Sequence, residues 1–321
     1  MKILITGLTG FVGSHLAEYC LTQKDIEIYG TMLSHHLGNE LKRVEHIKDK
    51  IELLECNLTN RVAVARVLEK SKPDKIFHLA AQSFVPTSWK SPEDTLFNNI
   101  ISELNIFETV REMKLDPIIV IACSSEEYGL VYENELPIKE TNPLRPLSSY
   151  AVSKVAQEKL AFQYHQSYGL KIILTRFFNT EGPRRGQDFV ISNFAKQVAE
   201  IEKGKQEPII YVGNLETKRD FSDVRDMVRA YWLASEKCKF GEPYNVCSEK
   251  TRTIKSVLDL LLSLSSVKNI EIRQDPERMR PSDVRVLLCD CSKFKKQTGW
   301  KREIPFEKTI EDVLNYWRKN L

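Results

Sequence analysis

The alternation of strand-like and helix-like segments, which begins at the second residue, constrains the fold of this 321-residue chain more than any other feature. Short apolar runs such as Lys2–Thr6, Lys75–Leu79 and Pro117–Ala122 have the length and composition of buried strands. Segments with helical spacing of apolar residues separate them, for example Phe11–Thr22 and Asp94–Met113. Strands that alternate with helices form a parallel sheet covered on both faces. The chain is therefore predicted to be an α/β protein with a doubly wound parallel sheet.

A glycine-rich turn joins the first predicted strand to the first predicted helix. Gly7, Gly10 and Gly13 punctuate it, with Phe11 and Val12 between the last two. Glycine at these places permits the tight turn, lets the backbone approach a pyrophosphate, and lets the helix pack closely on the strand. The helix N-terminus adds free N–H groups and partial positive charge. These five residues are therefore expected to bind a dinucleotide in a Rossmann-like unit.

The segment after the second predicted strand, Gly30–His36, bears on which nicotinamide cofactor binds. An Asp or Glu there would accept from the adenosine ribose hydroxyls and favour NAD. The segment contains neither, and an acid would repel a 2′-phosphate, so the sequence favours NADP and leaves NAD as the alternative. Lys42 and Arg43 are the nearest cations, while His35 and His36 are equally well explained as exposed loop residues.

The alternation of strands and helices loosens after Phe178, where proline and glycine become frequent. Residues 1–178 are predicted to form the dinucleotide-binding domain. Residues 179–321 are predicted to form mainly a smaller substrate-binding domain, with some segments returning to the first. No glycine- or serine-rich linker marks the boundary, so its position is approximate.

The composition disfavours several classes of protein. The chain has 28% charged residues, a net charge of +3 and no basic run, so nucleic acid is not an expected partner. No apolar run approaches the roughly 20 residues that span a bilayer, and no signal-peptide layout is present, so no membrane association is expected. The seven scattered cysteines favour reduced thiols and a cytoplasmic location over a disulfide framework. Cys289 and Cys291 lack a neighbouring histidine, and no metal site is expected.

Tyr150 and Lys154 are the most chemically suggestive pair in the chain. They stand four residues apart in a predicted helix and therefore on one face of it. A phenol, with a pKa near about 10, is a poor base at neutral pH, and a neighbouring ammonium group stabilises the phenolate. Ser124 ends a preceding strand and is expected to hydrogen-bond the same substrate oxygen as Tyr150. The three residues predict a proton-transfer site at the carboxyl ends of the strands.

The chain resembles the extended short-chain dehydrogenase/reductases over essentially its whole length. The matching stretches are the glycine turn, His78–Gln82, Ser124–Gly129 and Tyr150–Lys154. Within that superfamily it is most similar to the GDP-mannose 4,6-dehydratases and their relatives, the GDP-4-keto-6-deoxymannose reductases. The closer similarity lies in Phe178–Gly186, Val212–Leu215, Lys218–Phe221 and Arg280–Val284.

The resemblance implies a nucleotide-sugar 4,6-dehydratase that converts GDP-mannose, or a related GDP-hexose, to its 4-keto-6-deoxy form. Such an enzyme removes hydride from sugar C4, eliminates water across C5 and C6, and returns the hydride to C6. A carboxylate removes the C5 proton, and Glu126 stands two residues after Ser124, where the dehydratases carry that glutamate. The expected catalytic residues are therefore Ser124, Glu126, Tyr150 and Lys154. Glu127 is the weaker candidate, since neighbouring residues at a strand end point opposite ways.

A GDP-4-keto-6-deoxymannose reductase is the main alternative, because it needs only the Ser, Tyr and Lys of the predicted site together with NADPH. Two stretches are more similar to the dehydratases, Ala81–Val85 and Pro183–Gly186, and two to the reductases, Gly10–Gly13 and Gln206–Ile210. A nucleotide-sugar 4-epimerase would use the same Tyr and Lys without a Glu at position 126. The intact Ser, Tyr and Lys set argues against a non-catalytic dinucleotide-binding protein.

The resemblance also implies further binding residues. At the cofactor they are Asn57, Leu58, Leu79, Ala80 and Ala81, besides Tyr150, Lys154 and the glycine turn. At the nucleotide sugar they are Ser83, Ser125, Asn179, Arg219 and Arg280. Arginine suits a diphosphate because its planar fork matches two oxygens.

Several of these positions leave alternatives open. Arg219 has a structural ion pair with Asp220 as its other explanation. Arg184 and Arg185 would bind phosphate, meet a neighbouring subunit, or lie on a solvated loop. Asn193 stands where dehydratases tend to carry a cation, so one phosphate contact would be lost. The family implies a homodimer or a homotetramer, and closed symmetry is the general expectation.

Overall fold

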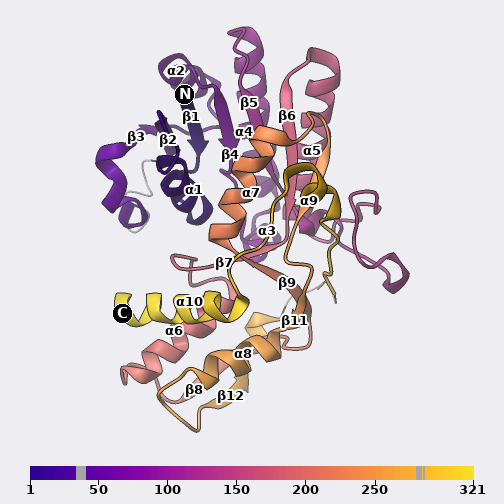
Figure 1. Ribbon diagram of the computed structural model, residues 1–321. Helices are drawn as coiled ribbons and strands as arrows, with labels where there is room; N and C mark the ends of the chain where they lie inside the picture. The colour runs from indigo at the N-terminus through magenta and orange to yellow at the C-terminus, as the bar shows by residue number, and fades with distance from the viewer. Residues whose placement is uncertain (34–40, 280–283, 285) are drawn as a thin grey trace.

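The computed structural model describes residues 1–33, 41–279, 284 and 286–321, and a seven-stranded parallel sheet forms its centre (Figure 1). The strand order is β10-β6-β5-β4-β1-β2-β3. The predicted α/β fold with a doubly wound parallel sheet is therefore confirmed. The strands are β1 (Lys2–Thr6), β2 (Glu27–Met32), β3 (Glu52–Glu55), β4 (Lys75–His78), β5 (Ile118–Ser124), β6 (Lys171–Phe177) and β10 (Pro243–Val246).

Both faces of the sheet are buried, as the continuous apolar runs of its strands require. Ile3 and Ile5 of β1 face one hydrophobic cluster and Leu4, between them, faces the other, because successive strand residues point to opposite faces. Helices α1 (Phe11–Leu21) and α7 (Val224–Lys237) cover the first face. The second face is covered by α2 (Arg61–Ser71), α4 (Pro92–Glu112) and α5 (Ser149–Tyr168).

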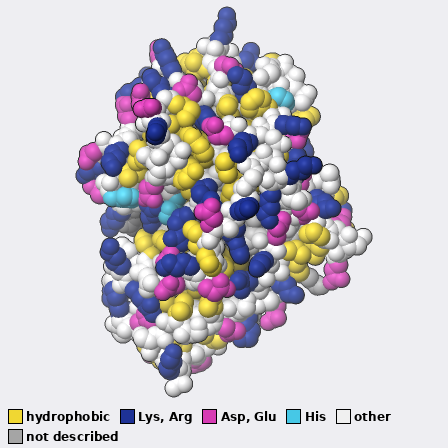
Figure 2. All heavy atoms as spheres, in the orientation of Figure 1, with side chains coloured by type: hydrophobic (Ala, Val, Ile, Leu, Met, Phe, Trp, Pro, Cys, Tyr) yellow, Lys and Arg dark blue, Asp and Glu magenta, His cyan; other side chains and the backbone are white. Residues whose placement is uncertain are grey.

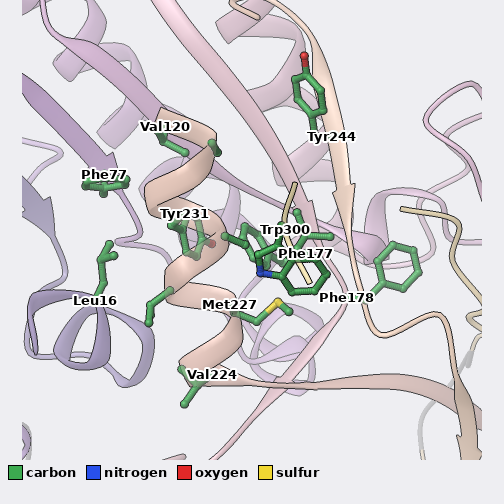
Figure 3. Packing of buried hydrophobic residues seen from close by; sticks show 14 of the residues in the cluster. Leu16, Phe77, Val120, Phe177, Phe178, Val224, Met227, Tyr231, Tyr244 and Trp300 are labelled. Atoms are coloured by element: carbon green, nitrogen blue, oxygen red, sulfur yellow. The ribbon is translucent and has the colours of Figure 1, made fainter. Parts of the chain in front are cut away.

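Helix α7 shows how the second half of the chain packs on the first. Met227 and Tyr231 point from α7 toward the sheet, where Tyr231 stacks on Phe177 with ring centroids 4.1 Å apart (Figure 3). Trp300, which is 2% exposed, lies beside the same cluster. Strand β10 adds itself to the edge of the sheet by pairing in parallel with β6. Two segments beyond residue 178 thus lie on the main sheet.

The rest of the second half forms a smaller layer below the carboxyl ends of the main strands (Figure 1). It has its own core, in which Phe194, Leu258 and Ile310 are buried. Its elements are β7 (Asn179–Glu181), α6 (Val190–Glu202), β8 (Ile209–Val212), β9 (Lys218–Asp223), β11 (Thr251–Thr253), α8 (Ile254–Ser263), β12 (Glu271–Gln274) and α10 (Phe306–Asn320). The short helices α3 (Val85–Lys90) and α9 (Ser292–Thr298) lie nearer the main sheet. The division of the chain at residue 178 stays a prediction.

The order of the strands defines where a ligand site is expected. From β1 the chain proceeds outward through β2 and β3, then returns to β4 on the other side and proceeds through β5 and β6. The order therefore reverses between β1 and β4, and ligands of such sheets bind in the crevice outside the carboxyl ends at this point.

Among the helices in the described ranges, none has the length and apolar composition that a membrane-spanning helix needs.

Candidate active site

The glycine turn brings the start of α1 against the end of β1. Gly7 has a φ of +67°, and a Cβ there would lie 3.1 Å from the Cα of Ala80. A Cβ on Gly13 would lie 2.4 Å from the carbonyl oxygen of Gly7. Gly10 precedes the helix as its N-cap residue and has no side chain to satisfy the first N–H groups of α1. These N–H groups suit a pyrophosphate, so the turn fits the dinucleotide that the sequence predicts.

The other predicted cofactor residues lie along the same edge of the sheet. Thr6, the last residue of β1, accepts hydrogen bonds from the backbone N–H groups of Leu79 and Ala80, both at 3.1 Å. Its hydroxyl also lies 2.9 Å from Nδ1 of His78, which is buried and whose pKa burial lowers to about 3. Ala81 follows directly, and Asn57 and Leu58 come after β3 on the same side. His78 thus contacts the hydroxyl of Thr6 that holds the backbone of Leu79 and Ala80.

Arg43 lies closer to the glycine turn than its distance in sequence suggests. Its Nη1 donates to the carbonyl oxygen of Thr9 and its Nε to that of Arg184, both at 3.3 Å. Arg184 itself donates Nη2 to Glu18 on α1 at 2.8 Å. Arg43, one of the two nearest cations after β2, therefore stands beside the phosphate-binding turn, while His35 and His36 lie outside the described residues.

Ser124, Tyr150 and Lys154 come together at the carboxyl end of β5. Ser124 ends that strand and hydrogen-bonds the hydroxyl of Tyr150 on α5. Lys154 follows one turn later, with Nζ 6.0 Å from the centre of the Tyr150 ring and donating to the carbonyl oxygen of Ala122 at 2.8 Å. Ser148 caps the helix by accepting from its third residue. The side chains are 8%, 8% and 3% exposed, so an ion formed here is largely shielded from water.

The environment of Tyr150 opposes its ionisation in the free protein. Burial raises the pKa of the Tyr150 phenol, and the hydrogen bond with Ser124 lowers it only in part. Burial likewise lowers the pKa of Lys154. Tyr150 is therefore a neutral proton donor at neutral pH until a bound ligand changes the local charge.

The two glutamates after Ser124 have different surroundings. They lie in a single 3-10 turn, η4 (Ser125–Glu127), and not on a strand. The argument that Glu126 and Glu127 point opposite ways because they end a strand was therefore wrong. Glu126 is partly exposed, and its charge acts on Tyr150 and raises the pKa of that phenol. Glu127 is fully buried, and its Oε1 accepts from the backbone N–H of Ser124 at 2.7 Å. Only Glu126 is accessible to a substrate.

Several buried polar atoms near this site have no hydrogen-bond partner among the described residues. Native proteins satisfy nearly all such atoms, so these are places where a bound ligand or water can supply the partner. They include Gln82 Oε1, Asn179 Oδ1, Glu181 Oε2, Arg185 Nε and Ser222 Oγ. They come from the loop after β4, from β7, from the loop after β7, and from β9.

Arg185 is the functional candidate that the sequence left undecided. Its guanidinium lies 4.8 Å from the ring centre of Phe11 in the glycine turn and 3.4 Å from that of Phe189. Its charge also lowers the pKa of Tyr150, and it opposes the rise in the pKa of Glu181 to about 7 that burial causes. Arg185 therefore connects the cofactor turn with the catalytic phenol. The similarity of the Pro183–Gly186 segment to the dehydratases pointed to this region, but the sequence alone could not show which of Arg184 and Arg185 lies at the site.

The predicted substrate residues that the structure describes come from both halves of the chain. Ser83 is exposed on the loop before α3, Ser125 is buried in η4, and Asn179 begins β7. Arg219 on β9 is 6% exposed, and its Nη1 donates to the carbonyl oxygen of Val284 at 2.5 Å.

Two neighbouring polar positions have hydrogen-bond partners among the described residues. Asp220, the alternative ion-pair partner of Arg219, accepts from the backbone N–H of Ser248 at 2.7 Å. Asn193 receives a cation from elsewhere in the chain, because Arg278 Nη1 donates to its Oδ1 at 2.7 Å. Arg280 lies outside the described residues.

A family model described as GDP-mannose 4,6 dehydratase matches residues 4–313. The chain belongs to the GDP-mannose 4,6-dehydratase family. It is 32% identical over 320 residues to the GDP-6-deoxy-D-mannose reductase of Pseudomonas aeruginosa, with 100% of this chain and 98% of the relative covered. It is also 32% identical over 347 residues to a GDP-mannose 4,6-dehydratase of Vibrio cholerae, with 97% and 92% covered. The resemblance read from the sequence is confirmed.

Two solved structures with a similar fold align with this chain over its full length. RMD from Pseudomonas aeruginosa, complexed with NADPH, is 29% identical with a TM-score of 0.85, and 100% of each chain is covered. UDP-glucose 4-epimerase from Thermotoga maritima, with UDP-glucose, is 26% identical with a TM-score of 0.88, and 100% and 99% are covered. The Rossmann-like fold is thus shared with proteins that are named for different reactions.

Proposed function

We propose that this family member is an NADP-dependent nucleotide-sugar 4,6-dehydratase acting on GDP-mannose or a related GDP-hexose. The observation that carries the proposal is the position of Glu126, which is accessible and stands beside Tyr150 on the turn after Ser124. Dehydration needs a carboxylate for the C5 proton and the C6 hydroxyl, in addition to the groups that act at C4. The relatives named as GDP-mannose 4,6-dehydratases support the same reaction.

The proposed roles follow from the geometry of the site. Ser124 and Tyr150 hydrogen-bond the C4 oxygen, and Tyr150 takes its proton while Lys154 stabilises the phenolate. When bound, NADP would supply the hydride chemistry, which is removal of a hydride from sugar C4 and its return to C6. Glu126 removes the C5 proton, which the 4-keto group has made acidic, and delivers a proton to the C6 hydroxyl as it departs as water. The return of the hydride to C6 is completed by a proton taken up at C5, which balances the proton that Tyr150 removed from the C4 hydroxyl, so that one water leaves in total.

The features of the cofactor site favour NADP. The glycine turn suits a pyrophosphate, no carboxylate follows β2 directly in the sequence, and Arg43 stands at the turn. RMD from Pseudomonas aeruginosa is complexed with NADPH, which supports this choice, whereas four other similar structures contain NAD. NAD therefore remains the alternative cofactor.

A GDP-4-keto-6-deoxymannose reductase is the second candidate. It is favoured by the similarity to the Pseudomonas aeruginosa reductase along the full length of both chains. Reduction of a 4-keto group requires Ser124, Tyr150 and Lys154 but not Glu126.

One assay separates the two candidates. Purified protein is incubated with GDP-mannose without added reductant, and the nucleotide sugar is analysed by mass spectrometry. Loss of one water supports the dehydratase. An unchanged sugar, together with NADPH consumption on GDP-4-keto-6-deoxymannose, contradicts the dehydratase and supports the reductase.

The surface of α4 and α5 supports the assembly of two copies of the chain. Phe97, Val152 and Phe162 are 56%, 44% and 48% exposed on these two packed helices. Exposed apolar side chains of this size mark association surfaces, and closed symmetry is usual. We therefore propose a homodimer or homotetramer, which light scattering would test.

On the face shown in Figure 2, basic and acidic side chains are interspersed. The seven buried free cysteines support a cytoplasmic location.

A further inference from the structure

Behind Ser124 and Tyr150 lies a group of buried ionisable side chains with more acids than cations. It consists of Glu103, Glu127, Glu158, Lys154 and Arg176, each at most 3% exposed, and is called here the acid cluster. Its members come from α4, η4, α5 and β6. Three carboxyl groups and two cations are buried together here, so the cluster itself contains more acids than cations. Apart from Lys154, none of these residues has a role in the proposed reaction.

Arg176 is fully occupied by Glu158 and by neutral groups. Its Nε and Nη2 donate to the two oxygens of Glu158 at 2.6 and 2.7 Å, and its Nη1 donates to the hydroxyl of Tyr128 at 2.7 Å. Lys159 also donates to Glu158 at 3.0 Å. Glu158 is therefore the ionised carboxylate of the cluster.

In the part of the chain that the structure describes, Glu127 is not hydrogen-bonded to a cation. Its Oε2 is 3.6 Å from Arg176 Nε, beyond hydrogen-bonding distance, and finds no donor among the described residues. Its Oε1 accepts from the backbone N–H of Ser124 at 2.7 Å. A carboxyl oxygen of Glu127, a carboxyl oxygen of Glu158 and the sulfur of Cys123 lie within 4.8 Å of one another, and all three side chains are buried. Ionisation of both of two buried carboxyl groups this close is unfavourable when the one nearby arginine hydrogen-bonds only Glu158, and this arrangement favours a proton held between them.

We propose that Glu127 is held as a neutral carboxylic acid that donates its proton to Glu158, and that this shared proton positions Ser124 and Glu126 for the reaction. The inference rests on the proposed roles of those two residues. Glu127 acts as a positioning residue through a capping box. It accepts from the N–H of Ser124, while the Ser124 hydroxyl accepts from the N–H of Glu126 at 3.2 Å. The turn that carries Glu126 is thus connected to the buried proton through the hydrogen bonds between Glu127, Ser124 and Glu126.

The charge of Glu127 also matters to the catalytic phenol. Ionised Glu127 would raise the pKa of Tyr150 and so disfavour the phenolate. The groups that face Glu127 are Glu158 and Lys154 from α5, Arg176 from β6, Glu103 from α4, and Cys123 from β5. Burial and the charge of Glu158 raise the pKa of Glu127, whereas Arg176 lowers it. As the pH rises through this raised pKa, the new negative charge should reduce activity.

Glutamine is the sharpest substitution for Glu127. Its amide oxygen accepts from Ser124 as the acid does, and its amide N–H donates to Glu158 as the shared proton does. Leucine has a similar volume and removes both bonds. We expect Glu127→Gln to keep kcat within about threefold at pH 7 and to retain activity at higher pH than the wild type. Glu127→Leu should lose roughly tenfold or more in kcat with little change in KM, the order expected when the bonds to Ser124 and to Glu158 are both lost.

Infrared spectroscopy of the ligand-free protein tests the protonation state directly and needs no substrate. The band of a protonated carboxyl group should be present at pH 7 and lose one component in Glu127→Gln. It should lose the same component in Glu158→Gln, because Glu127 then becomes the partner of Arg176 and ionises. Glu133→Gln, on an exposed 3-10 turn, is the control and should leave the band unchanged.

The proposal is overturned if Glu127→Gln is as impaired as Glu127→Leu, or if the band is identical in the wild type and both buried variants. Inactivity of the wild type on every GDP-sugar would instead count against the proposed function, and the infrared comparison would still decide the protonation of Glu127.

Discussion

Replacing Gly13 with alanine tests the packing that holds the cofactor turn. The added Cβ would lie 2.4 Å from the carbonyl oxygen of Gly7 and 2.8 Å from the Cα and oxygen of Leu8. All three atoms belong to the backbone, so no side chain can rotate away. Reaching ordinary contact at 3.4 Å requires α1 to move from β1 by about 1 Å. Overpacking of this kind costs about 1–3 kcal/mol.

The movement should affect cofactor binding more than it affects the fold. The first N–H groups of α1 would leave the pyrophosphate, so the Kd for NADPH should rise about tenfold or more. The melting temperature should fall by about 2–6 °C. Gly186→Ala is the control, because its Cβ meets only the ring of Phe189 at 3.8 and 3.9 Å. Fluorescence titration with NADPH and thermal unfolding measure both effects. Wild-type values for Gly13→Ala would refute the reasoning from close packing.

Three other substitutions test the site and the core. Tyr150→Phe should reduce kcat by about 10²–10⁴ while NADPH binding is retained, and an active variant would remove the phenol from the mechanism. Glu126→Gln should still exchange hydride at C4 but release no dehydrated sugar in the mass spectrum, whereas the exposed control Glu133→Gln should behave as wild type. Burial raises the pKa of Asp220 to about 6 from 3.8, so its contribution to stability is present below about pH 4 and lost as the pH rises to 6. Asp220→Asn, which still accepts from Ser248, should be more stable than wild type at pH 7 by up to about 3 kcal/mol, and urea unfolding should show the difference vanish near pH 4.

The sequence predicts the centre of the sheet well because buried parallel strands are continuous apolar runs. Lys2–Thr6 is the same strand in prediction and structure, and the predicted helix at Tyr150 begins within one residue of α5. The proximity of Ser124 to Tyr150 follows from the same logic, since neighbouring parallel strands and their helices end at one edge. Local periodicity and motif spacing are sufficient for these features.

Features that depend on distant contacts are not predictable in this way. Strand β10 has only four residues, and it becomes a strand by pairing with β6, about seventy positions earlier. The role of Arg185 depends on the side chain of Phe189 and on the position of Phe11 in the turn. Glu127 differs from Glu126 because η4 turns one of them inward, a local geometry that strand alternation does not describe.

The return of β10 to the main sheet has a consequence for the catalytic turn. Asn245 on β10 accepts from the hydroxyl of Tyr128 at 2.7 Å, and that hydroxyl accepts from Arg176 at 2.7 Å. The backbone N–H of Asn245 also donates to the side chain of Glu140 at 2.8 Å. Buried networks of this kind fix a unique arrangement only when all their members are present. The residues after Ser124 are therefore held on one side by the proton between Glu127 and Glu158, as proposed above, and on the other by a strand from the second half of the chain.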